Sequence, residues 1–213
     1  MPLLNAAPPW QPARSEYVVL LHGCTASDKS NIEKGISLAH CAVDTGFGQG
    51  FYTTTVKRQA RHWAWIRFYE WQKSNPGLTG NQPVVLQFRM RRFAKTSSAK
   101  KSPAVFERSL DKLLSLAFVT GSYDNEDYWS LVQHCRQSTP ATVYNHARLP
   151  GAWYDVVLGP VAAFWQQRVA MQDADQFSFH TKAGIDILDA LIQQGLKSGP
   201  NGDPDYYTWF PVP

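Results

Sequence analysis

Two segments of the sequence carry residue types that could hold a ligand. His22 and Gly23 follow the apolar run 17–21, whose composition is typical of a buried β-strand. The glycine-rich stretch 46–50 precedes a second β-prone segment, residues 51–54. An imidazole can donate or accept a hydrogen bond, a tyrosine ring offers a flat face, and glycine lets a ligand approach the backbone. Both segments are therefore candidate parts of one binding site.

The His22-Gly23 pair has other interpretations when it is considered alone. Leu-Leu-His-Gly also resembles the oxyanion loop of α/β-hydrolases, but that interpretation requires a G-x-S-x-G nucleophile elbow, and the sequence has none. A histidine that ends a strand before a glycine turn is the structural alternative. The segments further along the chain decide between these interpretations.

Four segments in the same order resemble one superfamily. His22-Gly23 is followed by residues 46–52, then by residues 154–162 (Tyr-Asp-Val-Val-Leu-Gly-Pro-Val-Ala) and residues 176–181 (Gln-Phe-Ser-Phe-His-Thr). This order resembles ADP-ribosyltransferases of the His-Tyr-Glu type, which includes diphtheria toxin and poly(ADP-ribose) polymerases. It is most similar to a microbial branch with a His-Gly strand and a Phe-Gly-x-Gly-Phe-Tyr segment.

The resemblance implies an α+β fold with a split, mixed β-sheet and flanking helices. We expect residues 1–14 to form an extended arm, and residues 15–213 to form one catalytic domain with an irregular C-terminal tail. The patterns predict strands at 17–21, 83–89, 153–158 and 176–179 and a further strand from about residue 51. They predict helices at about 30–40, 56–73, 106–120, 127–137 and 181–196.

The resemblance also implies a role for each part of an NAD site. His22 would bond a ribose hydroxyl, the backbone of Gly23 would reach the carboxamide, and Tyr52 would stack on the nicotinamide ring. Trp63 is the candidate for a second stacking aromatic, with His62 as the next choice. Core packing of the aromatics and turn formation by the glycines are the structural alternatives. The implied NAD-binding set is His22, Gly23, Cys24, Thr25, Gly48, Gly50, Phe51, Tyr52, Ala60 and Trp63.

The third catalytic position departs from the superfamily pattern. Relatives carry a glutamate on a late strand, where it stabilises the positive charge that develops on the ribose. Here Gln176 or Ser178 occupies that place, so the implied catalytic residues are His22, Tyr52, Gln176 and Ser178. A nearby carboxylate could supply the charge instead; the candidates are Asp155, Asp173 and Asp175.

The resemblance therefore implies an NAD-dependent mono-ADP-ribosyltransferase that uses NAD as a substrate, because in relatives loss of the glutamate argues against chain elongation. Alternatives are an NAD glycohydrolase, including a toxin that depletes NAD, a module that binds NAD or ADP-ribose without turnover, and a basic nucleic-acid-binding protein without NAD chemistry. The acceptor would be a protein or a nucleic acid. A net charge of +4 and the basic stretch from Arg89 to Lys101 favour anionic partners weakly.

The composition limits the remaining possibilities. Hydrophobic residues make up 44% and charged residues 18% of the chain, which is typical of a folded domain. The three cysteines show no CxxC or Cys/His spacing, so we expect no metal. We find no signal peptide and no apolar run of membrane-spanning length, so we expect a cytoplasmic protein without a membrane partner, although a specialised secretion route stays open.

Overall fold

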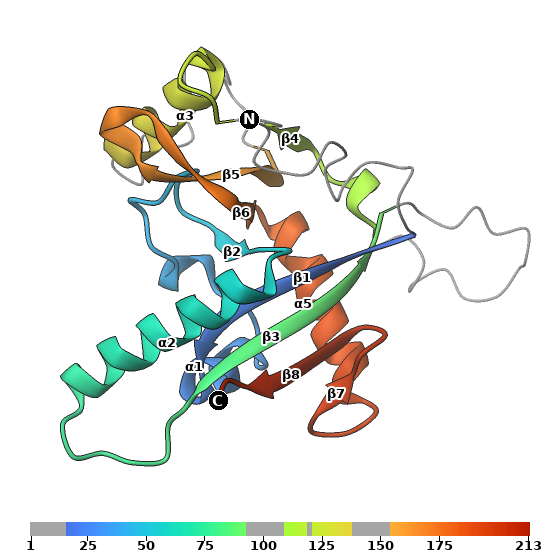
Figure 1. The fold of residues 1–213 in the computed structure, drawn as a ribbon. Coiled ribbons are helices and arrows are strands. Elements are labelled where there is room, and N and C mark those ends of the chain that lie inside the picture. Colours follow the sequence, from blue (N-terminus) through green and yellow to red (C-terminus); the bar gives the residue numbers. More distant parts are fainter. Residues whose placement is uncertain (1–15, 93–108, 119–120, 138–153) are drawn as a thin grey trace, which may run out of the picture.

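The computed structural model describes residues 16–92, 109–118, 121–137 and 154–213, and it confirms the α+β class. The expected arm at residues 1–14 and most of the basic stretch, from residue 93 on, lie outside the described residues. The strands form two four-stranded sheets (Figure 1).

The first sheet contains the His22 strand. Its order is β1 (Tyr17–Thr25), β3 (Pro83–Arg91), β8 (Tyr207–Pro211) and β7 (Gly202–Asp203), and every neighbouring pair is antiparallel. The second sheet has the order β2 (Phe51–Thr53), β6 (Val169–Phe179), β5 (Val156–Phe164) and β4 (Ser115–Ala117). Because β4 and β5 run parallel while the other pairs are antiparallel, this sheet is mixed.

One residue pair joins the two sheets. The Leu21 amide donates to the Thr54 carbonyl at 2.7 Å, and the Thr54 amide donates to the Leu21 carbonyl at 2.8 Å. This antiparallel bridge places β2 beside β1, so the strands follow one another as β6, β2, β1 and β3. The sheet is thus split at the step between β1 and β2.

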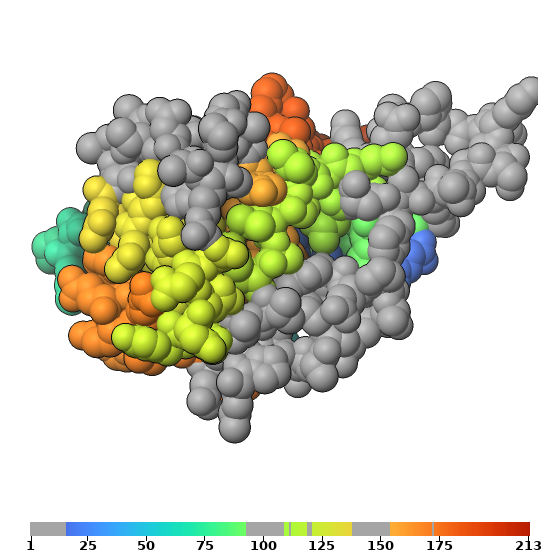
Figure 2. Space-filling view, turned by 90° about the horizontal axis from the view of Figure 1, so that it is seen from above, coloured from blue at the N-terminus to red at the C-terminus, as the bar shows by residue number. Residues whose placement is uncertain are grey.

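Four α-helices in the described part of the chain cover the sheets. They are α1 (Ala26–Ile32), α2 (Lys57–Ser74), α3 (Glu126–Gln137) and α5 (Lys182–Leu196). Helix α2 packs on the first sheet through β1 and β3, and α5 lies on the opposite face of that sheet (Figure 1). Seen from above, α3 lies across β5 and β6, and α2 projects at the edge (Figure 2).

Three groups of buried side chains hold these layers together. The largest lies between both sheets and α5, and includes Leu20, Phe51, Phe88, Phe177 and Leu188. A second packs α3 against the outer face of the second sheet, and a third packs α2 against the outer face of the first. Each sheet therefore has one face in the shared core and one face under its own helix.

The first predicted helix begins earlier and ends sooner than expected. Thr25 caps α1 through a capping box with Asp28, so the helix starts at Ala26 rather than at Ser30. It ends at Ile32, before Gly35 with φ of 142°, and only a short 3-10 turn at Leu38–His40 follows. The prediction of a helix at 30–40 was wrong because the Thr25 cap was overlooked.

Three further predictions were wrong in the second half of the chain. Where the pattern predicted a helix at 106–120, the described residues form a 3-10 turn, Leu110–Lys112, and strand β4. The strand predicted at 153–158 is β5 (Val156–Phe164), which begins later and continues through Gly159 and Pro160. The register shifts just after Pro160, whose carbonyl accepts side-chain bonds. The tail is not irregular, because β7 and β8 extend the first sheet and bury Tyr207.

Candidate functional site

His22 lies near the middle of β1 with a half-buried imidazole. Its Nδ1 is 2.6 Å from the Tyr52 carbonyl oxygen, and because a carbonyl only accepts hydrogen bonds, Nδ1 carries the proton. The ring stacks on Phe51 with centroids 4.4 Å apart. Burial lowers the pKa of His22, so the imidazole is neutral at pH 7. It anchors the backbone of β2 to β1.

Tyr52 joins β2 to the glycine-rich loop that precedes it. Its hydroxyl accepts bonds from Thr45 Oγ1 at 2.7 Å and from the Phe47 amide at 2.9 Å, and it donates to the Gly48 carbonyl at 2.8 Å. Burial raises the pKa of this phenol, which therefore stays protonated. Three bonds on one hydroxyl fix the position of the loop, and Gly48 supplies the φ of 82° that its turn requires.

The side chains of His22 and Tyr52 lie on opposite faces of the paired strands β1 and β2. Leu21 and Thr54 are directly opposite each other, so their side chains share a face, and Tyr52 shares that face because it precedes Thr54 by two residues. His22 points to the other face, where it meets Phe51 and the shared core. The structure brings the two strands together, but the imidazole and the phenol do not converge on one cleft.

Gln176, Ser178 and His180 lie on the Tyr52 face, along β6 and just after it, and we call them the polar row. Ser178 is the direct partner of Tyr52, and its Oγ is 2.8 Å from His180 Nε2. His180 Nδ1 is 2.8 Å from the Gln49 carbonyl and so carries the ring proton, which leaves Nε2 to accept from Ser178. The Ser178 hydroxyl also lies 3.2 Å from the Val157 carbonyl, to which it can donate a longer hydrogen bond instead. Burial lowers the pKa of His180 to about 4.

The glycine-rich loop covers the polar row. Gln176 is buried and donates from Nε2 to the Pro160 carbonyl at 3.0 Å. A Cβ on Gly46 would lie 3.0 Å from that Gln176 nitrogen, and a Cβ on Gly50 would lie 2.8 Å from His180 Nδ1. Because positions 46 and 50 are glycines, the loop backbone can pack closely against the polar row.

Gly23 serves helix packing in this structure. A Cβ at this position would lie 2.0 Å from the Ala60 carbonyl oxygen and 2.6 Å from the Ala64 amide nitrogen of α2. Helix α2 thus covers the face of Gly23 on which a side chain would stand. The neighbouring Cys24 is buried in the shared core, and Thr25 caps α1, so both have structural roles.

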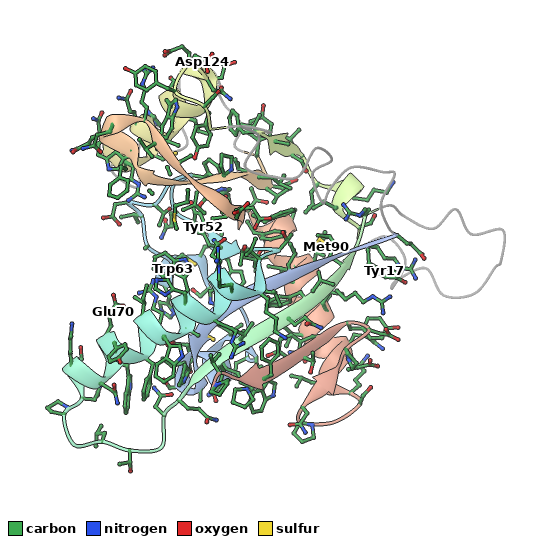
Figure 3. The ribbon with its side chains drawn as sticks, viewed as in Figure 1. Tyr17, Tyr52, Trp63, Glu70, Met90 and Asp124 are labelled. Carbon is green, nitrogen blue, oxygen red and sulfur yellow. The ribbon has the colours of Figure 1, made fainter. Side chains whose placement is uncertain are left out.

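Trp63 lies on α2 with 44% of its surface exposed, and Figure 3 shows it together with Tyr52. Among the described residues it stacks on no other ring, so its role as the second aromatic beside nicotinamide stays a prediction. His62 on the same helix is exposed.

The three candidate carboxylates differ in their surroundings. Asp175 is buried and accepts bonds from Thr54 Oγ1 at 2.5 Å, from the Thr55 amide at 2.8 Å and from the Thr55 hydroxyl. Burial raises its pKa. Asp155 accepts from the Leu114 amide at 2.8 Å and from the Thr181 hydroxyl.

Asp173 is exposed, at a φ of 55°. The bonds of Asp155 and Asp175 fix strand and helix ends, and none of the three carboxylates belongs to the polar row.

Sequence reasoning missed His180 and the Asp175 network. The spacing of Gln176, Ser178 and His180 was a usable signal, because alternate residues of a strand share a face. Gln59, which exchanges bonds of 2.8 and 3.2 Å with the Asp175 backbone, lies far away in sequence and gave no such signal.

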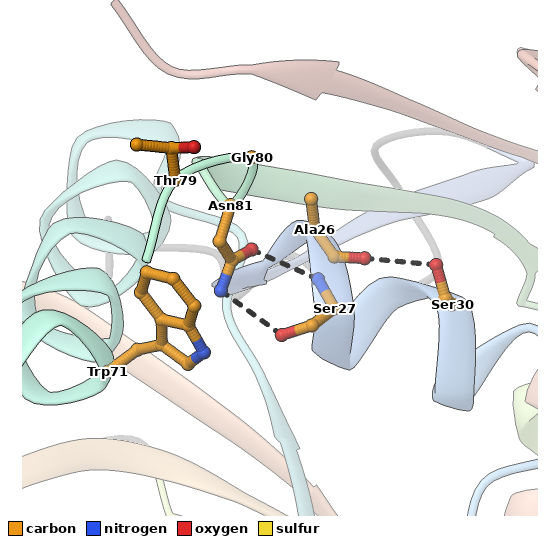
Figure 4. Close-up of a pocket in the computed structure, with 7 residues that line it drawn as sticks. All are labelled: Ala26, Ser27, Ser30, Trp71, Thr79, Gly80 and Asn81. Atoms are coloured by element: carbon orange, nitrogen blue, oxygen red, sulfur yellow. Dashed lines mark hydrogen bonds between the residues drawn. The ribbon is translucent and has the colours of Figure 1, made fainter. Parts of the chain in front are cut away.

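A shallow hollow of about 340 Å³ lies elsewhere, between α1, α2 and the segment before β3 (Figure 4). Trp71 forms one wall. Asn81 accepts from the Ser27 amide and donates to its hydroxyl, both at 3.1 Å. None of the residues predicted from the sequence lines this hollow.

The described residues include no cluster of three or more potential metal ligands, and none of their helices is long and apolar enough to cross a membrane. Comparisons with protein-family models, curated proteins and solved structures found no match to this chain. Function must therefore be inferred from the geometry of the polar row and its neighbours.

Proposed function

We propose that this chain binds NAD on the Tyr52 face of β2 and β6 and cleaves the nicotinamide–ribose bond, passing ADP-ribose to a macromolecular acceptor. The observation that carries the proposal is the pairing of Tyr52 with Ser178, beside the strand that holds His22. The resemblance in the sequence implies a site formed by a histidine-bearing strand and by the tyrosine-bearing strand that follows it. His22 would act as a positioning residue through the Tyr52 carbonyl rather than by touching the dinucleotide.

The residues of the row have chemistry that suits this reaction. When the C1′–N bond breaks, its electron pair leaves with nicotinamide, and the acceptor attacks C1′ and gives up a proton. The Tyr52 ring would stack on nicotinamide, and the Gln176 amide would bond a ribose hydroxyl. A neutral His180 can receive the acceptor's proton through Ser178, because its Nε2 already accepts from that hydroxyl.

Access to the row requires movement of the glycine-rich loop. Gln176, Ser178 and His180 are 7%, 0% and 2% exposed, respectively, so a ligand reaches them only when residues 46–50 lift and Phe47 leaves the cluster that it forms with α3. The loop is held by the Tyr52 hydroxyl, by the contact of the Gln49 carbonyl with His180, by bonds from the Gln49 side chain to the Leu38 and Cys41 carbonyls, and by the buried Phe47 ring. Stacking of a ligand on Tyr52 would therefore couple binding to loop opening.

Release of nicotinamide from NAD, measured by chromatography, tests the proposal. We expect Tyr52→Ala to lower the rate at least about 100-fold, because a stacked ring positions the scissile bond. Tyr123→Ala removes a tyrosine that is 70% exposed and is the matched control. Equal rates in both folded variants would contradict the site.

Binding without turnover is the second candidate, favoured by the absence of a carboxylate from the row. Gln176 and Ser178 carry no charge, and Asp175 is fully engaged by Thr54 and Thr55. Calorimetry that detects NAD or ADP-ribose binding, with no release of nicotinamide, would select this candidate. NAD labelled in the adenosine would separate transfer from hydrolysis, because hydrolysis leaves no label on a macromolecule.

A further inference from the structure

Helix α2 contacts the sheet through very small side chains. Of its 18 residues only Ala60 and Ala64 are buried, and both lie against Gly23. The larger side chains are left at the flanks and on the outer surface, including Tyr69 at 58% exposure. Aromatic residues are frequent there; they are Trp63, Trp65, Phe68, Tyr69 and Trp71.

One flank of α2 carries cations and rings in a single line. Arg58, Arg61, Trp65 and Tyr69 follow one another at spacings of three or four residues, which places them along one stripe of a helix. We call these four residues the α2 stripe. The Trp65 and Tyr69 rings are 6.0 Å apart, so the aromatic part is continuous.

The charge of the helix is strongly positive. Five basic residues stand against one acidic residue, Glu70, and that carboxylate pairs with Arg67 at 3.1 Å. Within the described part of the chain, Arg58 and Arg61 make no ion pair, so both guanidinium groups are available to an external anion.

We propose that the α2 stripe binds single-stranded nucleic acid. The guanidinium groups of Arg58 and Arg61 would contact phosphates, and the ring of Tyr69 would stack on a base. An anionic membrane is a poorer fit, because Ile66 is the only aliphatic side chain of α2 larger than alanine and the helix has no broad apolar face to insert.

This surface is separate from the Tyr52 face. Gln59, which bonds the backbone of Asp175, and Trp63 lie one turn apart on the other flank of α2. The proposal therefore does not depend on NAD chemistry, and nucleic acid bound here would be presented beside the Tyr52 site rather than inside it.

Fluorescence anisotropy with a labelled single strand of about 20 nucleotides, in DNA and RNA forms, tests the proposal on the full chain. We expect the Arg58→Ala, Arg61→Ala double variant to bind at least about 10-fold more weakly. The slope of log affinity against log salt concentration should fall by the contribution of about two phosphate contacts. We expect Tyr69→Ala to weaken binding at least about 5-fold.

The matched control removes two exposed cations near the ends of α5. Lys182→Ala with Lys197→Ala lowers the net charge equally, at positions far from α2 in sequence. If this control weakens binding as much as the arginine variant does, the stripe is not a site. Equal affinity for a duplex of the same length would contradict the stacking role of Tyr69. Binding to phosphatidylserine vesicles but not to either single strand would contradict nucleic acid as the ligand.

Discussion

Two glycine contacts in this molecule look alike but differ in what they touch. A Cβ on Gly23 would meet backbone atoms of α2, the nearest only 2.0 Å away. A Cβ on Gly46 would meet the end of the Gln176 side chain, 3.0 Å away. The first contact joins a strand to a helix, whereas the second joins a loop to a side chain that can turn.

The Gly23 contact belongs to the rigid framework of the fold, whereas the Gly46 contact belongs to a loop that covers the polar row. Backbone atoms at Ala60 and Ala64 cannot give way without moving α2, so Gly23 fixes the helix on the first sheet. The loop 46–50 is held over the polar row by hydrogen bonds of the Tyr52 hydroxyl, His180 and Gln49, which can exchange for water, and by the buried Phe47 ring, which packs under α3. Three substitutions and a change of pH would test this contrast, from the largest expected effect to the smallest.

Gly23→Ala is expected to have the largest effect. The added Cβ overlaps the Ala60 carbonyl, so α2 must shift, and we expect the free energy of unfolding to fall by at least about 3 kcal/mol. Urea unfolding followed by circular dichroism measures this. Gln72→Ala at an exposed position of α2 is the control, and a loss at Gly23 no larger than at Gln72 would mean that α2 sits further from β1.

Acidification should destabilise the protein through His180. Its pKa in the folded state, about 4, lies below the ordinary 6.5, so the unfolded state binds the proton more readily between these values. The stabilising contribution is complete above pH 6.5, and we expect it to fall by about 2 to 3 kcal/mol by pH 4.5.

Urea unfolding of the parent and of His180→Asn at about pH 7.5 and about pH 4.5 isolates this contribution. Asp175 and Asp189 have raised pKa values, so their contributions change in the opposite direction and cancel between the two proteins. An equal change in both proteins would show that His180 is not buried in neutral form beneath the loop.

Tyr52→Phe should loosen the loop without moving the strands. Removing the hydroxyl leaves the Phe47 amide without its acceptor and the Gly48 carbonyl with the Thr45 hydroxyl as its remaining side-chain donor, for a loss of about 1 to 3 kcal/mol. Hydrogen exchange should quicken at the Phe47 amide, while the amides of β1 keep their protection. Tyr69→Phe, on an exposed side chain, serves as the comparison, and unchanged exchange at Phe47 would disprove the anchoring role.

Gly46→Ala should have the smallest effect. The new methyl group meets only the flexible end of Gln176, and the unfolded chain loses conformational entropy, so we expect stability to change by less than about 1 kcal/mol. The measurement is the same urea unfolding. A loss as large as that of Gly23→Ala would show that the loop is as rigid as the helix contact.

Local patterns were sufficient for much of the fold. The predicted helices at 56–73, 127–137 and 181–196 agree closely with α2, α3 and α5, and the strands at 17–21 and 83–89 lie within β1 and β3. The tail was misjudged because prolines and glycines surround Tyr207–Pro211 and indicate a loop, and only pairing with β3 makes this segment a strand.

The site was predicted less well than the fold. The sequence correctly suggested that the His22 and Tyr52 segments are neighbours, because β1 and β2 do meet. It could not tell which face each side chain occupies, since that depends on the register between Leu21 and Thr54. Packing of α2 on Gly23 depends likewise on a tertiary contact that no local pattern encodes.

The junction between the sheets has a mechanical consequence. In the described part of the chain, two backbone hydrogen bonds between Leu21 and Thr54, with the His22 contact beside them, tie β2 to β1. Bending the molecule at this line would break far fewer bonds than separating β1 from β3, which share a nine-residue ladder. The two sheets are thus held together chiefly by side chains, namely the shared core and the bonds between Gln59 and Asp175, rather than by a backbone ladder.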